Sequence, residues 1–223
     1  MDFRRFHYAL LLVFAIASTG SAVDVGKQIS PDDWAAWRGP EQKGIAPGPL
    51  PPTSWSADSN ILWTAQISGR GHSSPTVVGP HVYLATADEE NETQSVICLD
   101  RESGERLWEK VVHRGGLVKK MNQKASHASS TVACDGERLF INFLHDGAIH
   151  TTALTRNGEI LWQTRIGDYI VHQGYGASPA IYKSLVLVSA DNKGGGVVAG
   201  LNRETGNIVW KVNRPKLPNY ASP

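Results

Sequence analysis

The pattern of hydrophobic and polar positions predicts short strands rather than helices. From residue 61 onward, brief apolar runs alternate with polar turns that carry glycine, and no long stretch after the first residues shows a helical period. Several predicted strands place apolar residues side by side, as in Leu107-Trp108, Leu161-Trp162 and Val209-Trp210. A strand whose two faces are both covered has this pattern. The sequence therefore predicts an all-β domain in which sheets are stacked against one another.

One strand–turn–strand unit occurs three times, each time with a glycine in the turn and a tryptophan four residues later. The copies are Cys98–Trp108, Ala153–Trp162 and Ala199–Trp210. The glycine permits a positive φ at a tight hairpin turn. Trp63 belongs to a further copy, which has the second strand but lacks the turn before it.

A second element, an apolar hairpin, precedes each of these units. The three hairpins begin near His72, His127 and Gly176. The tryptophans at 63, 108, 162 and 210 are spaced by 45, 54 and 48 residues. A period of this length with four short strands per unit is typical of a β-propeller blade. We expect blades at about 73–112, 129–166 and 178–212, and an unmatched strand at 61–67 before them. The predicted propeller region is therefore 61–223.

These repeats resemble the tryptophan-bearing blades of the pyrroloquinoline-quinone-like β-propeller family. The motif Leu99-Asp-Arg-Glu-Ser-Gly-Glu-Arg-Leu-Trp108 carries the resemblance, and Trp34-Ala-Ala-Trp-Arg-Gly-Pro40 is similar to the lead-in of secreted bacterial members. The family includes quinone-dependent alcohol dehydrogenases and non-catalytic envelope scaffolds. The resemblance implies that Trp63, Trp108, Trp162 and Trp210 dock between blades.

Three blades do not close a ring, since propellers typically have four to eight. The sequence stops at Tyr220–Pro223, which matches the blade opening Gly176–Pro179. We therefore expect the chain to be the N-terminal part of a longer propeller. The alternative is a short protein whose ring is assembled from several copies.

The first residues have the features of an export signal. Arg4 and Arg5 precede the apolar run Ala9–Ala17, and small residues at Gly20–Ala22 offer a cleavage site. This predicts a signal peptide at 1–22 and a periplasmic or extracellular protein. Residues 23–60 form a lead-in, in which Ser30 could cap a short helix that begins at Pro31. No stretch in the mature chain predicts a membrane span.

Composition argues against several function classes. The formal net charge is +1, so nothing calls for nucleic acid as a partner. Quinone chemistry would need a bound calcium ion, a carboxylate base and, in the family, an adjacent cysteine pair. The chain has only Cys98 and Cys134, which could form a disulfide or remain free thiols. The acidic loop Asp88–Glu92 could bind calcium, but it also fits a solvated hairpin.

The best candidate binding surface is one rim of the propeller. His72, His127 and Tyr175 each lie just before the first strand of a blade, and His172 lies in the loop Asp168–Gly174. The enlarged basic loop His113–Lys124 leads to the same rim. Function often resides on loops carried by a rigid scaffold, although these residues could equally satisfy backbone groups.

The sequence thus favours a non-catalytic, exported scaffold or binding module of the cell envelope, with no cofactor, that takes a protein or saccharide-like ligand. The alternative is part of a quinone-dependent oxidoreductase that uses pyrroloquinoline quinone with calcium and whose active site lies in further blades. We assign no catalytic, cofactor-binding or metal-ligating residue.

Overall fold

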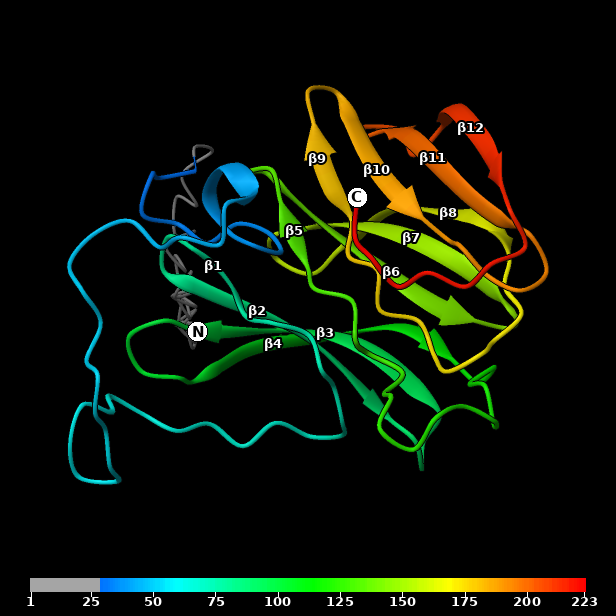
Figure 1. Cartoon of the computed structure of the whole chain (residues 1–223). Coiled ribbons are helices and arrows are strands. Elements are labelled where there is room, and N and C mark those ends of the chain that lie inside the picture. The colour runs from blue at the N-terminus through cyan, green and yellow to red at the C-terminus, as the bar shows by residue number, and fades with distance from the viewer. Residues whose placement is uncertain (1–28) are drawn as a thin grey trace, which may run out of the picture.

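The computed structural model describes residues 29–223, which form three four-stranded antiparallel sheets set side by side (Figure 1). The strands of blade one are β1 (Thr76–Val78), β2 (His81–Asp88), β3 (Thr93–Asp100) and β4 (Arg106–Arg114). Those of blade two are β5 (Ala133–Cys134), β6 (Arg138–His145), β7 (Ala148–Thr155) and β8 (Ile160–Asp168). Those of blade three are β9 (Ala180–Tyr182), β10 (Leu185–Ser189), β11 (Gly196–Asn202) and β12 (Ile208–Arg214). The predicted fold class, an incomplete propeller of about three blades, is confirmed. The predicted signal peptide lies outside the described residues.

Each sheet follows the chain order, so every blade is a meander of hairpins. The middle strands β3 and β6 are buried along nearly their whole length. Neighbouring blades cover both faces of β6, whereas β3 has blade two on one face and Trp63 and Ala65 of the preceding connection on the other. Two apolar cores lie between the described blades, and a smaller cluster of Val82, Ile97 and Leu99 lies on the other face of blade one. One lies between blades one and two around Tyr83 and Leu139, and the other lies between blades two and three around Phe140 and Val186.

The tryptophans join each blade to the next through the indole N–H. Trp63 donates to the Arg101 carbonyl at 2.9 Å, and Trp108 donates to the Arg156 carbonyl at 3.2 Å. Trp162 donates to the Arg203 carbonyl, also at 3.2 Å.

The turn glycines make this docking possible. Gly104 has a φ of 74°, and a Cβ placed there would lie 2.4 Å from the Trp63 ring. Gly158 and Gly206 sit in the same way under Trp108 and Trp162. A side chain at these turns would therefore be both strained and in collision with the indole.

Trp210 differs from the other three. It is 37% exposed, and its ring lies over Gly200 of its own sheet rather than on a turn of another blade. Every residue of β12 is exposed. The last sheet thus presents an uncovered apolar face that includes Ile208, Val209 and Val212.

The predicted strand at 61–67 does not form, which corrects the sequence-based assignment. These residues pair with no strand within residues 29–223, and a strand without a neighbour has no ladder of hydrogen bonds. They belong to a long connection between the lead-in and β1, which first loops away from the sheets (Figure 1) and then brings Trp63 and Ala65 against blade one. Trp63 nevertheless docks on the turn of blade one.

The lead-in also differs from expectation, because no α-helix begins at Pro31. Ser30 and Asp33 close a turn instead, in which the Ser30 N–H donates to the Asp33 carboxylate at 2.8 Å. Trp34 then pairs with Val77 of β1, and the short 3₁₀ helix η1 (Pro40–Gln42) follows. We call residues 29–44 the strap, because they lie across the innermost strands of blades one and two.

A row of hydroxyl groups ties the innermost edges of the blades together. The N–H of Ser74 donates to Thr131 Oγ1 at 3.0 Å, that of Thr131 to Ser178 Oγ at 2.9 Å, and that of Ser178 to Ser222 Oγ at 2.8 Å. These contacts hold the starts of the blades at one end of the arc. We call that end, with the loops that link the blades, the loop rim. The opposite end, with the hairpin turns that receive the tryptophans, is the turn rim.

Candidate binding rim

The loop rim is built from two linkers of unequal length. The first follows β4 and runs from residue 115 to 132, and the second follows β8 and runs from 169 to 179. Both are irregular, and they touch where the N–H of Asn122 donates to the Gln173 carbonyl at 2.9 Å. Because the sheets fix both ends of each linker, the rim can hold a defined surface without regular structure.

One hollow of about 340 Å³ opens where the first linker meets blade one. Its lining includes Arg70, Glu89, Lys119 and His127. Arg70 is held in place, because its guanidinium donates to the Gln123 carbonyl at 3.0 Å. Burial lowers the pKa of His127, so this ring favours the neutral form near neutral pH. The hollow therefore combines a fixed guanidinium with a neutral imidazole, beside Lys119 and Glu89.

A second hollow of about 250 Å³ lies between the two linkers and includes Lys124, Tyr175 and Tyr220 in its lining. Tyr175 is only 8% exposed, and its hydroxyl donates to the Ser189 carbonyl at 2.9 Å. Burial raises the pKa of Tyr175 well above its ordinary value. This side chain forms a wall of the hollow and offers no free hydroxyl.

The four predicted rim residues do not form one cluster. His127 and Tyr175 line a common small space beside Asn142. His172 is exposed and contacts the Tyr220 hydroxyl through Nδ1 at 3.1 Å. His72 is exposed and lines none of these hollows, but its N–H donates to the Ala128 carbonyl at 3.0 Å. The rim is thus organised around the basic linker rather than around the histidines.

A group of three histidines at the interface of blades one and two was missed by sequence reasoning. His113 stacks on His145 with ring centroids 4.1 Å apart, and His150 meets both rings edge-on. His113 is buried and its Nε2 has no hydrogen-bond partner. Burial, followed by the neighbouring imidazoles, lowers the pKa of His113 to about 3. The three positions lie on β4, β6 and β7, so only the packing of the blades brings them together.

The two cysteines are separate, buried free thiols. Cys98 lies in β3 and Cys134 in β5, so neither forms a disulfide. Burial raises the pKa of Cys98 to about 12 and that of Cys134 to about 11. Both thiols therefore stay protonated and pack as small apolar groups.

Within residues 29–223, no group of three or more His, Cys, Asp or Glu side chains is arranged to hold a metal ion. In the acidic loop, the Asp88 carboxylate accepts hydrogen bonds from the N–H groups of Glu90 and Asn91 and from the Asn91 amide. Its oxygens thus close the hairpin turn.

Comparison with known proteins places the chain in a family. The sequence profile of the family described as outer membrane protein assembly factor BamB matches residues 53–128 and 92–222. The chain therefore belongs to this family of pyrroloquinoline-quinone-like repeat propellers. No match to a curated protein was found.

Similar solved structures were found at low sequence identity, and the first of the two described here supports the fold. The quinohemoprotein alcohol dehydrogenase ADHIIG from Pseudomonas putida HK5 is 16% identical with a TM-score of 0.54, over 87% of this chain and 30% of that one. BamB from Moraxella catarrhalis is 13% identical with a TM-score of 0.40, over 70% of this chain and 56% of that one. The chain thus spans under a third of the dehydrogenase and little more than half of BamB.

In the part of the chain that the structure describes, no helix is long and apolar enough to cross a bilayer.

Proposed function

We propose that this chain is part of an exported, non-catalytic propeller scaffold of the cell envelope, which binds a protein partner through the loop rim. The observation that carries the proposal is the basic linker between blades one and two. It brings Lys119, Lys120 and Lys124 to the rim, next to two hollows and beside Arg70. Such a surface suits a partner with acidic groups, because opposite charges raise the rate of encounter and fix orientation.

Membership in the BamB family supports a scaffold of the envelope, and the charged start of the sequence supports export. If the signal is cleaved after Ala22, N-terminal sequencing of exported protein begins at Val23. Exported protein that retains Met1 would contradict the export step.

Site-specific photo-cross-linking tests the binding surface. In one variant a photoreactive side chain replaces Gln123 of the basic linker. In a matched control it replaces Glu102, which lies in a hairpin turn of the turn rim. Irradiation of producing cells is expected to give a discrete protein adduct from position 123 and none from position 102. Equal adducts from both positions, or none from position 123, would rule out the loop rim as the binding surface.

Equilibrium dialysis tests whether this chain itself holds a quinone site, and the same dialysis of the protein with further blades tests the alternative in which those blades carry the site. The full chain, dialysed against pyrroloquinoline quinone with calcium, is expected to leave the free quinone concentration unchanged. Stoichiometric retention of the quinone would instead support the alternative.

A further inference from the structure

The innermost strands of the three blades offer equivalent backbone positions toward the centre of the arc. Val77, Cys134 and Ile181 occupy these positions, since they lie opposite Val82, Leu139 and Val186 of the second strands. In an antiparallel pair, residues alternate between facing the partner strand and facing away from it. At Val77 the N–H and the carbonyl face away from β2, and we infer the same orientation for Ile181 of β9.

The strap fills the first two of these positions. The N–H of Trp34 donates to the Val77 carbonyl at 2.8 Å, and the N–H of Val77 donates to the Trp34 carbonyl at 2.9 Å. The N–H of Cys134 donates to the Ala35 carbonyl at 2.8 Å. The strap thus acts as a short added strand along blade one and reaches blade two.

The third position is unfilled within residues 29–223. Among the described residues, no hydrogen bond joins the Ile181 main chain to a residue outside its own sheet. A hollow of about 620 Å³ separates it from the strap, with Ala35, Ala36 and Ile181 in its lining. A second hollow of about 300 Å³ lies beside Ala180 and Pro223. Together they form a groove along β9, which we call the β9 groove.

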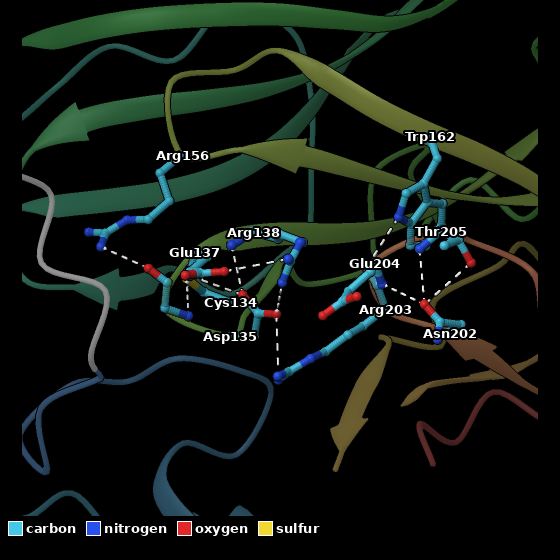
Figure 2. Close-up of polar contacts among 11 residues, drawn as sticks. Cys134, Asp135, Glu137, Arg138, Arg156, Trp162, Asn202, Arg203, Glu204 and Thr205 are labelled. Atoms are coloured by element: carbon cyan, nitrogen blue, oxygen red, sulfur yellow. Dashed lines mark hydrogen bonds and ion pairs between the residues drawn. The ribbon is translucent and has the colours of Figure 1, made fainter. Parts of the chain in front are cut away.

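Lys183 and Arg203 line the turn-rim end of the β9 groove, together with Asp33, Glu41 and Asp135, whose carboxylates already have partners elsewhere in the chain. Lys183 is exposed and forms the β9–β10 turn with Ser184. Arg203 also lines the hollow, and its buried Nε has no hydrogen-bond partner. Figure 2 shows the Arg203 side chain reaching toward Asp135, and the nearest nitrogen lies 3.7 Å from that carboxylate. This loose contact leaves the guanidinium with free donors.

The strap indicates which side chain would meet this charge. At blade one, the residue before the paired Trp34 is Asp33, whose carboxylate accepts the Gly79 N–H of the β1–β2 turn at 2.9 Å. Lys183 occupies the place of Gly79 in blade three, because both follow the last residue of the innermost strand. In a strand added to blade three, a carboxylate at the position of Asp33 would lie beside the β9–β10 turn and the Lys183 ammonium group.

We propose that the β9 groove binds an extended acidic peptide segment of a partner protein by strand addition to Ile181. The peptide main chain exchanges hydrogen bonds with Ile181, and an Asp or Glu one residue earlier faces Lys183 and Arg203. Strand addition draws its affinity from main-chain hydrogen bonds and its specificity from pockets for alternate side chains. The site lies away from the loop rim, so it is independent of the surface proposed above.

The test uses a fluorescein-labelled peptide with the strap sequence Pro-Asp-Asp-Trp-Ala-Ala-Trp, because this sequence already pairs with an innermost strand. Fluorescence anisotropy follows its binding to the full chain at low protein concentration. The peptide is expected to bind saturably. Ile181→Pro is expected to weaken binding by at least about tenfold, because proline removes the inward N–H. This N–H takes no part in the β9–β10 ladder, so the blade should remain intact.

Three controls make the result decisive. Ile181→Val keeps the N–H and is expected to bind like the unchanged chain. Lys183→Glu, on an exposed turn, is expected to weaken binding of the Asp peptide but not of its Asn-substituted form. Circular dichroism checks that each variant stays folded. Absence of saturable binding, or equal binding by folded Ile181→Pro and Ile181→Val chains, would overturn the proposal.

Discussion

The turn rim and the loop rim belong to the same three blades but differ in how regular their contacts are. At the turn rim each contact is a copy of the last, with an indole that donates to an arginine carbonyl above a glycine turn. At the loop rim the linkers differ in length, sequence and the hollows they enclose. Repetition thus marks what holds the blades together, and variation marks where a partner could be recognised.

The contacts of Trp108 and Trp162 between blades are expected to contribute most to the free energy of unfolding. Trp108→Ala and Trp162→Ala each remove a half-buried indole and its hydrogen bond, at an expected cost of about 3–5 kcal/mol in the free energy of unfolding. Urea unfolding followed by circular dichroism measures this loss.

Trp210→Ala is the matched control, because this exposed tryptophan has no turn of another blade to dock on. Its expected cost is below about 1 kcal/mol. Equal losses for Trp108, Trp162 and Trp210 would contradict the docking account.

The histidine group predicts a smaller, pH-dependent effect at the interface of blades one and two. The folded-state pKa of His113 is lowered to about 3 from an ordinary value of 6.5. Between these values the unfolded chain binds a proton that the folded chain does not, so acid favours unfolding. The contribution of His113 is complete above pH 6.5 and is lost as the pH falls toward 3. At pH 5.5 the expected loss is on the order of 1 kcal/mol.

His113→Phe removes this titration and keeps an aromatic ring against Phe143 and His145. Urea unfolding between pH 7.5 and 5 is expected to show a flatter pH dependence for this variant. His145 and His150 remain in it, with Asp146 and Arg165 beside His150. If the variant and the unchanged chain lose stability in parallel, His113 is not the group responsible.

The blades could be predicted from the sequence because the motifs that specify them are local. A glycine turn followed by a tryptophan specifies one hairpin, and its spacing gives the repeat. The prediction of a strand at 61–67 was wrong for a non-local reason, because the apolar residues there have no neighbouring strand to pair with among the described residues. The prediction of a helix in the strap was wrong because a tertiary contact outweighed a local signal. Ser30 and Pro31 favour a helix start, but Trp34 gains two hydrogen bonds from Val77 by staying extended.

The candidate sites show the same limit. The sequence placed His127 and Tyr175 near one rim, and the structure lines one small space with both. It could not show that Tyr175 would be buried, or that His113 would stack on His145 with His150 edge-on to both. Those contacts depend on the offset between blades, which no single repeat specifies. The unfilled position at Ile181 becomes visible only when three innermost strands are compared.

The most direct test of the account is the adduct yield at position 123 in a chain with its rim charges reversed. Lys119→Glu, Lys120→Glu and Lys124→Glu are combined, and Lys43→Glu, Arg101→Glu and Arg106→Glu form a control with the same charge change elsewhere. Exposed substitutions of this kind usually change stability by less than about 0.5 kcal/mol each. We predict that the adduct is lost in the first chain and kept in the second, with both chains folded. An adduct that survives reversal of the rim charges would contradict the assignment of partner binding to the loop rim.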